Sequence, residues 1–180
     1  TQPTCKHQPM QIRSKLMESP FGLRSRRGEL QMRIVSLVPS LTLTLFELGC
    51  TVGEIVGRIP WCIHPKDAVE HVQVVGGTKT PNVKKIMALE HALVVLDREE
   101  NPKSIHDELV AAGINVFVSS VEHPSEVPEM LRQLGKAIER QDAAEEWASS
   151  IESKLQSMKL NPLQSARVAP MIWHEPLMSV

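Results

Sequence analysis

Apolar residues alternate between short unbroken runs and helically spaced positions, and the first such pair spans residues 32–49. Residues 34–38 (Ile-Val-Ser-Leu-Val) form a run with β-branched members, which is typical of a strand covered on both faces. Pro39 cannot continue a central strand, Ser40 can cap a helix, and Gly49 is a suitable left-handed stop. The pattern predicts a strand, a tight turn and a helix.

The helical segment also permits a second interpretation. Leu41, Leu43 and Leu45 alternate as they would in a strand, whereas Leu41, Leu45 and Leu48 share one face of a helix. The cap and stop signals favour the helix. A strand that leads into a helix in this way opens an α/β domain, and ligands of such domains lie at the carboxyl ends of the strands. We therefore expect Pro39 and Ser40 to face a ligand.

The same alternation continues toward residue 118. The segment 58–77 is rich in loops, and residues 92–96 (Ala-Leu-Val-Val-Leu) form the clearest strand pattern of the chain. Strands are predicted at 54–57, 92–96 and 114–118, and helices at 82–89 and 104–113, with Ser104 as the cap of the second. Strands separated by helices of about ten residues indicate a parallel sheet with right-handed crossovers.

Two longer helices follow this region. Ser125 is predicted to start the first, and Asp142 with Glu145 matches a capping box at the start of the second. The second helix, 142–160, would be about 28 Å long. Its predicted apolar stripe consists of Ala144, Trp147, Ile151, Leu155 and Met158. Residues 167–173 then predict a new strand, which suggests a second domain of which little is present.

Composition limits the function classes. The chain has 180 residues, is 42% hydrophobic and carries a net charge of −1, which gives no reason to expect nucleic-acid binding. No apolar run approaches the ~20 residues that span a membrane. Residues 1–31 are polar, without the apolar core of a signal peptide, and are predicted to be a disordered leader. Three cysteines at wide spacing predict neither a disulfide framework nor a zinc site.

The loop of residues 61–65 (Trp-Cys-Ile-His-Pro) groups an aromatic ring, a thiol and an imidazole. Trp61 can be either a lid over an apolar patch or a stacking surface for a ligand. Cys62 and His64, with His71 nearby, are possible metal ligands. No second pair completes a four-ligand set, so we expect a ligand-facing or structural loop and no metal site.

Two further segments are candidates for a binding site. Residues 76–79 (Gly-Gly-Thr-Lys) resemble a phosphate-binding turn but lack the P-loop spacing, so the glycines are expected to allow close approach of a ligand or a neighbouring loop. Residues 97–101 (Asp-Arg-Glu-Glu-Asn) follow the clearest strand. Their carboxylates can serve as acid and base, or can belong to a solvated turn before Pro102. No nucleophile–base pair is evident, so no catalytic residue is predicted.

Taken together, these segments resemble the cobalamin-binding-like branch of the ABC-transporter solute-binding proteins, the helical-backbone metal receptors. The resemblance covers residues 32–180. The matching segments are 33–40 (Arg-Ile-Val-Ser-Leu-Val-Pro-Ser), 61–65, 75–79 (Val-Gly-Gly-Thr-Lys), 92–95, 99–101 and 172–178 (Ile-Trp-His-Glu-Pro-Leu-Met), together with Thr42, Leu45, Leu48, Gly49 and Leu89.

The resemblance implies two Rossmann-like α/β lobes joined by a long backbone helix, with the ligand between them. Residues 32–141 would be the amino-terminal lobe, 142–161 the helix, and 166–180 the first strand of a truncated second lobe. It implies a periplasmic, monomeric, non-catalytic component of an importer that binds cobalamin, haem or an iron–siderophore complex, has no cofactor of its own and docks on an ABC permease. The implied ligand-facing residues are Pro39, Ser40, Trp61, Cys62, His64, Gly77, Thr78, Lys79, Glu99, Asn101 and Trp173.

Three features depart from the family pattern. Leu43 stands where an acidic residue is usual, and the docking region reads Val83-Lys84-Lys85, which is basic rather than acidic. Cys5 has no lipobox-like apolar run before it. Two other functions therefore stay open: a cytosolic relative that binds a nucleotide or small metabolite, either as a binding protein or as an enzyme, and a fragment without binding activity.

Overall fold

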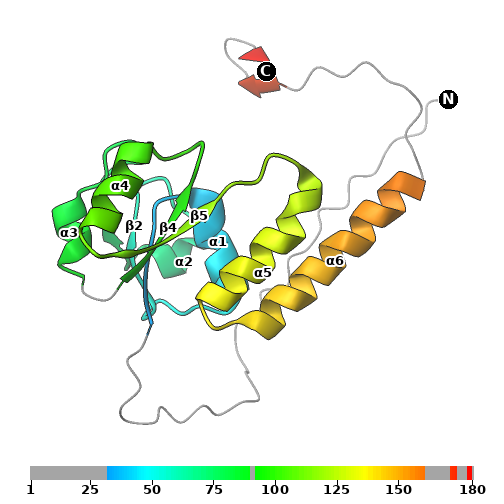
Figure 1. The fold of residues 1–180 in the computed structure, drawn as a ribbon, viewed down its shortest axis with the longest axis horizontal. Coiled ribbons are helices and arrows are strands. Elements are labelled where there is room, and N and C mark those ends of the chain that lie inside the picture. Colours follow the sequence, from blue (N-terminus) through cyan, green and yellow to red (C-terminus); the bar gives the residue numbers. More distant parts are fainter. Residues whose placement is uncertain (1–31, 90–91, 161–170, 174–177, 180) are drawn as a thin grey trace, which may run out of the picture. The chain divides into compact units, whose positions relative to one another are not determined.

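A five-stranded parallel sheet forms the centre of the protein. The computed structural model describes residues 32–89, 92–160, 171–173 and 178–179. The strands are β1 (Arg33–Ser36), β2 (Ile55–Arg58), β3 (Gln73–Val74), β4 (Ala92–Asp97) and β5 (Asn115–Ser119). Their order is β3-β2-β1-β4-β5 and every neighbouring pair is parallel, which confirms the predicted α/β fold (Figure 1).

This strand order creates a switch point in the middle of the sheet. The chain runs outward from β1 through β2 to β3, and then crosses back to β4 on the other side of β1. Loops that follow parallel strands all leave from the same edge of the sheet, which we call the carboxyl edge. The connections after β1 and β4 diverge there, and such a divergence is where open α/β sheets bind ligands.

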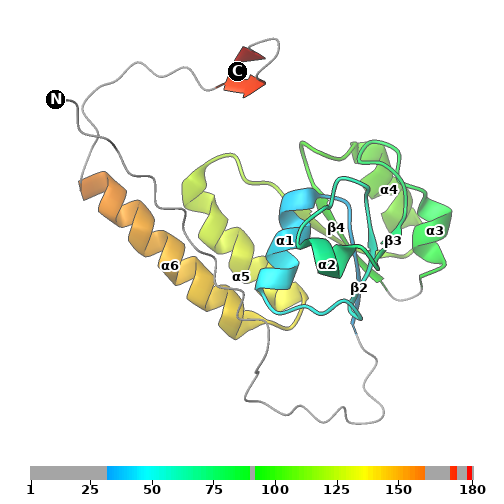
Figure 2. The ribbon, with the colours of Figure 1, turned by 180° about the vertical axis from the view of Figure 1, so that it is seen from behind.

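Helices cover both faces of the sheet. Their bounds are α1 (Pro39–Glu47), α2 (Lys66–Val69), α3 (Val83–Met87), α4 (Lys103–Ala111), the 3₁₀-helix η1 (Pro124–Glu126), α5 (Val127–Ala137) and α6 (Gln141–Leu160). Figures 1 and 2 show α1 and α5 on one side of the sheet and α3 and α4 on the other.

Two apolar cores result from the alternation of side chains along the strands. Ile34 and Val95 pack in one core with residues of α1, α5 and α6. Val35 and Val94, their neighbours in sequence, pack in the other core with residues of α3 and α4. Successive strand residues point to opposite faces, so an unbroken apolar run is what this buried sheet requires.

The first helix confirms the helical interpretation of residues 39–48. Leu41, Leu45 and Leu48 are buried, whereas Leu43 is exposed. The predicted cap is wrong, because Ser40 lies inside the helix and Val38 occupies the N-cap position. Pro39 takes the first helical position, where its missing N–H costs nothing and its fixed φ suits the helix.

Three other predicted helix starts also need correction. Ser104 lies inside α4, whose N-cap position is Pro102. The cap near Ser125 is His123, whose ring nitrogen accepts a hydrogen bond from the backbone N–H of Ser125. Glu145 does not form a capping box with Asp142, because its carboxylate accepts hydrogen bonds from Arg132 on α5 instead.

The long helix α6 packs along α5 through small residues. Ala144 and Ala148 are fully buried there, and Ile151 and Leu155 are half-buried. Trp147 and Met158 are exposed, so the predicted stripe was wrong at these two positions. Ala148, which the prediction omitted, takes a place in the interface because a close helix approach favours small side chains.

At the end of the chain, β6 (Met171–Trp173) pairs antiparallel with β7 (Met178–Ser179) in a separate two-stranded sheet. The strand predicted at 167–173 is thus found over its last three residues. The predictions for residues 1–31 and 161–170 lie outside the described residues, and a second lobe stays a prediction. Among the helices that the structure describes, none combines the length and apolar character needed to cross a membrane.

Candidate ligand-binding site

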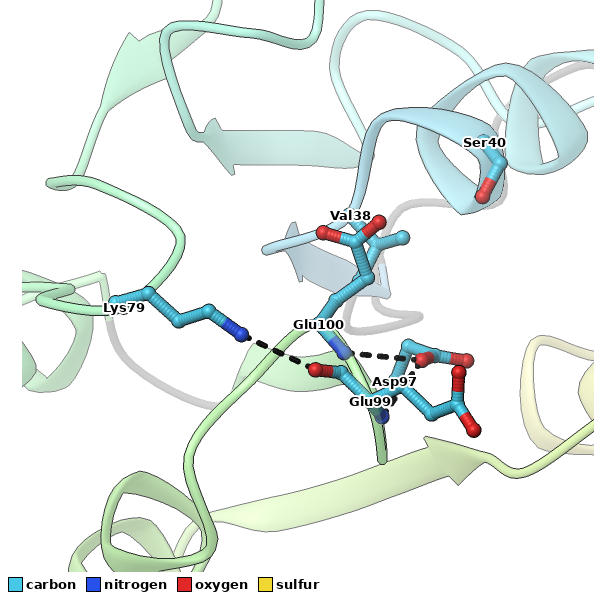
Figure 3. Close-up of a pocket in the computed structure, with 6 residues that line it drawn as sticks. All are labelled: Val38, Ser40, Lys79, Asp97, Glu99 and Glu100. Carbon is cyan, nitrogen blue, oxygen red and sulfur yellow. Dashed lines mark hydrogen bonds between the residues drawn. The ribbon is translucent and has the colours of Figure 1, made fainter. Parts of the chain in front are cut away.

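An open pocket of about 370 Å³ lies at the switch point of the sheet. Its lining residues come from the ends of β1 and β4, the start of α1 and the loop before α3: Val38, Ser40, Lys79, Asp97, Glu99 and Glu100 (Figure 3). The structure thus brings together Ser40, Lys79 and Glu99 of the predicted set. Asp97 and Glu100 belong to the candidate segment 97–101 because they follow the clearest strand, but the ligand-facing residues implied by the resemblance do not include them.

The acidic residues of the pocket lie on a tight turn. The Asp97 carboxylate accepts hydrogen bonds from the backbone N–H groups of Glu99 and Glu100 at 2.9 and 3.2 Å. This side-chain-to-backbone bonding closes the turn locally, as Asp residues commonly do. The side chains of Glu99 and Glu100 remain exposed to solvent.

Asn101 closes the same turn from inside the protein. Its side-chain oxygen accepts a hydrogen bond from the Asp97 N–H at 2.9 Å. Its amide nitrogen donates to the carbonyl oxygen of Leu37 at 3.3 Å and to that of Thr78 at 3.0 Å. The residue is only 6% exposed. The side chain predicted to contact a ligand is therefore occupied by three partners within the protein.

The loop before α3 carries Lys79, which supplies the only ammonium group among the described residues that line the pocket. Lys79 extends toward the turn after β4, and its Nζ donates to the carbonyl oxygen of Glu99 at 3.1 Å (Figure 3). Gly76 has a φ of +127°, and a Cβ there would lie within 2.9 Å of backbone atoms of Thr80, Pro81 and Asn82. Only glycine fits this position. Gly77 and Thr78 are half-buried.

The Trp61 loop follows β2 and leaves from the same carboxyl edge. Trp61 is 67% exposed and Ile63 is 57% exposed, so the loop presents apolar surface to solvent. Cys62 between them is completely buried in the core beside α3 and α4. The prediction that Cys62 faces a ligand is corrected by this placement, because a side chain without exposed surface has no access to one.

A buried polar cluster anchors the Trp61 loop to the first helix. The Thr42 hydroxyl lies 3.0 Å from the Cys62 sulfur, 2.8 Å from the Ser36 hydroxyl and 2.9 Å from the Val38 carbonyl oxygen. Burial raises the pKa of the Cys62 thiol, and the hydrogen bond with Thr42 opposes that rise. The thiol therefore stays protonated at neutral pH and acts as an anchor rather than a nucleophile.

The remaining predicted residues are dispersed. Pro39 is half-buried at the start of α1, and His64 is exposed. Cys62 is buried whereas His71 is exposed, so these two and His64 do not converge as metal ligands. No group of three or more His, Cys, Asp or Glu side chains within the described part of the chain is placed to hold a metal. Trp173 lies in β6, and its side chain is outside what the structure describes.

Charge in the pocket is mainly negative. Asp97, Glu99 and Glu100 contribute three carboxylates against the single ammonium of Lys79. The neighbouring Arg98 is paired with Glu122, at the end of the loop after β5. The pocket therefore offers hydrogen-bond acceptors along most of its lining and one cationic donor.

Known proteins resemble this chain in sequence and in fold. The vitamin B12-binding protein of Yersinia pestis (strain Pestoides F) is 27% identical over 129 residues, which cover 71% of this chain and 45% of that protein. The solved periplasmic vitamin B12 binding protein BtuF of Vibrio cholerae has a TM-score of 0.71 at 21% identity, and covers 82% of this chain and 58% of its own.

A haem-binding protein shares the fold as well. The periplasmic heme-binding protein RhuT from Roseiflexus sp. RS-1 has a TM-score of 0.62 at 20% identity, over 75% of this chain and 52% of its own. The chain thus spans about half the length of the relatives it matches. A family model described as periplasmic binding protein matches residues 34–175. The chain therefore belongs to the periplasmic binding protein family.

Proposed function

We propose that the carboxyl edge of this lobe is one wall of a binding site for a corrinoid, the ligand class of cobalamin. The observation that carries the proposal is the combination on one sheet edge of an acceptor-rich pocket and the exposed side chains of Trp61 and Ile63. A corrinoid presents an apolar ring face and a rim of amide groups. The first suits an aromatic surface and the second suits carboxylate acceptors.

The charge of the pocket distinguishes this ligand from the alternatives. Haem carries two carboxylates, which Asp97, Glu99 and Glu100 would repel and which Lys79 alone would not balance. The side-chain amides of a corrinoid are neutral N–H donors and meet no such repulsion. The names of the vitamin B12-binding relatives agree with this preference, although haem-binding proteins share the fold.

The proposed activity is binding followed by delivery to an ABC permease, without chemical conversion. Membership of a periplasmic binding protein family supports this role and a periplasmic location. The thiols at Cys50 and Cys62 are buried, and burial raises the pKa of both, so neither is a competent nucleophile. A permease-coupled protein should bind its ligand reversibly and release it unchanged, which mass spectrometry of the released ligand can verify.

Calorimetric titration of the full-length protein with cobalamin and with haem tests the ligand class. We expect saturable one-to-one binding of cobalamin and at least about tenfold weaker binding of haem, because the charge repulsion need supply only ~1.4 kcal/mol for that ratio. Stronger binding of haem, or no binding of cobalamin, would contradict the corrinoid assignment.

Replacing the two tryptophans that are exposed in the described part of the chain, Trp61 and Trp147, tests the site. Trp61→Ala is expected to weaken cobalamin binding about tenfold through loss of ring contact. Trp147→Ala is the matched control, because Trp147 lies in the second turn of α6 and this helix begins at the opposite edge of the sheet. Arg140, directly before α6, pairs there with Glu54. Equal losses in both variants would place the ligand elsewhere.

A further inference from the structure

Asn101 lies where three segments of the carboxyl edge meet. Its side chain joins the end of β1 at Leu37, the Gly76–Lys79 loop at Thr78 and the end of β4 at Asp97. Both amide hydrogens and the carbonyl oxygen of the side chain are therefore used. The burial of this amide gives each of the three bonds more weight than a bond at the surface, because a broken one leaves a buried polar group without a partner.

We propose that Asn101 is a positioning residue that fixes the Gly76–Lys79 loop against the sheet and so determines where the Lys79 ammonium lies in the pocket. The Asn101 amide donates one hydrogen bond to the carbonyl oxygen of Thr78, and Thr78 directly precedes Lys79 in the chain. The position of the sole cation in the described lining thus depends on a side chain of a different loop. The effect of Asn101 on ligand selectivity rests on the proposed function. Its effect on the position of the Gly76–Lys79 loop rests only on the hydrogen bonds described above.

A second hydrogen bond, made by Lys79, also joins the Gly76–Lys79 loop to the turn after β4. Its effect must be separated from that of the Asn101 side chain. The Lys79 Nζ donates to the Glu99 carbonyl oxygen from an exposed position. An exposed lysine gains little from such a bond, because water competes for it and the long side chain loses rotamer freedom. The Asn101 side chain is largely buried, so water competes less for its hydrogen bonds, and it is accordingly the determining contact.

The substitution Asn101→Asp tests the two donated bonds specifically. It keeps the size of the side chain and the oxygen that accepts from the Asp97 N–H, but it replaces the donor with a carboxylate oxygen facing two carbonyl oxygens. Asn115→Asp is the matched control, because Asn115 is exposed at the start of β5, at the opposite edge of the sheet. Lys79→Met removes only the hydrogen bond from the Lys79 ammonium to the Glu99 carbonyl oxygen.

Hydrogen exchange of the ligand-free full-length protein supplies the first readout. The N–H groups of Gly77 and Asn82 bond within the loop, to Thr80 and Val75. We expect residues 76–82 to exchange about tenfold faster or more in Asn101→Asp. In the same variant β1, β4 and α5 should keep their wild-type rates. Asn115→Asp and Lys79→Met should stay within about twofold of wild type throughout.

The environment of Lys79 supplies the second readout. After reductive ¹³C-methylation, the Lys79 methyl signal, assigned by its absence in Lys79→Arg, should move in Asn101→Asp toward the position of the exposed Lys154. Unchanged exchange of residues 76–82, an equal increase in all segments, or an effect of Lys79→Met as large as that of Asn101→Asp would overturn the proposal. If Asn101→Asp does not fold, Asn101→Ser, which keeps one hydroxyl donor, is subject to the same criteria.

These measurements separate the inference from the proposed function. A loosened loop in Asn101→Asp together with no cobalamin binding by wild type would reject the ligand and retain the positioning role. Cobalamin binding with an unchanged loop would reject the positioning role alone. If the loop loosens in Asn101→Asp and wild type binds cobalamin, the variant's preference for cobalamin over haem should differ from that of wild type by about threefold or more. The reason is that the Lys79 ammonium is displaced in the pocket.

Discussion

Gly135 on α5 lies directly against the methyl group of Ala144 on α6. A Cβ added to Gly135 would come much closer to the Ala144 Cβ than real carbon atoms approach, and would lie 3.1 Å from the Arg140 carbonyl oxygen. The connection between the helices is correspondingly tight, with Glu139 at a φ of +58°. The absence of a side chain at Gly135 therefore sets the distance between α5 and α6.

Gly135→Ala should separate these helices. Alanine favours a helix by about 1 kcal/mol over glycine, but overpacking of a close contact costs about 1–3 kcal/mol. We expect net destabilisation in urea denaturation. Combining the substitution with Ala144→Gly should recover part of the loss, and strict additivity of the two substitutions would contradict direct contact.

The charged side chains of the same interface predict a dependence on pH. Arg132 donates to both carboxylate oxygens of Glu145, at 2.7 and 2.9 Å, and this pairing, helped by Ser149, lowers the pKa of Glu145 from 4.5 to about 2. A carboxyl whose pKa is lower in the folded state contributes stability above its unfolded pKa and loses it as pH falls toward its folded pKa. The contribution of Glu145 should thus disappear between about pH 4.5 and 2.

Glu145→Gln measures this contribution. The variant should be less stable than wild type at pH 6, and the difference should shrink as pH falls through that window or as salt is added. Denaturation midpoints at several pH values provide the measurement, with the exposed neighbour substitution Glu146→Gln as control. A difference that grows on acidification would have the wrong sign for this ion pair.

Substitutions at Gly76 and Gly113 distinguish the cost of a steric clash from the cost of an unfavourable backbone conformation. Both have positive φ, but a Cβ on Gly113 would meet no atom within 4 Å, whereas one on Gly76 would collide with backbone. Gly113→Ala should cost only the left-handed penalty of about 1–2 kcal/mol. Gly76→Ala should in addition disrupt residues 76–82. Hydrogen exchange of that loop distinguishes the two, and intact protection in Gly76→Ala would refute the steric assignment.

The hydroxyl of Thr42 should stabilise the Trp61 loop. Thr42→Val keeps the shape of the side chain but removes the partner of Cys62 and Ser36, at an expected cost of about 1–3 kcal/mol. Cys62 should also react faster with a thiol reagent, as followed by peptide mass mapping. The half-buried Thr44 on the same helix provides the control, Thr44→Val, and equal effects of the two would argue against the anchoring role.

Much of the fold was predictable from local patterns. A strand buried on both faces must be apolar at most of its successive positions. Residues 92–96 meet this requirement throughout, and residues 34–38 meet it except at Ser36, whose buried hydroxyl accepts a hydrogen bond from Thr42. Helix starts were less predictable, because serine and proline compete as signals. Pro39 and Pro102 determined where α1 and α4 begin, and Ser40 and Ser104 became helical residues.

The candidate site was predictable as a region but not in detail. Residues near strand ends could be assigned to the carboxyl edge from the α/β pattern alone. The partners of Asn101 lie 4, 23 and 64 residues away, and the partner of Cys62 lies 20 residues away. Only the three-dimensional path of the chain brings these groups together, so no spacing rule could show that both side chains face inward.

The burial of α6 decreases along its length. Ala144 and Ala148 are enclosed, Ile151 and Leu155 are half-covered, and Met158 is 67% exposed. The first two turns of α6 are therefore held in the core, whereas among its described residues the later turns bury less surface and are joined to α5 by the ion pair of Glu152 with Arg132. Hydrogen exchange within the described part of α6 should therefore be slowest around Ala144 and Ala148 and become faster toward Met158.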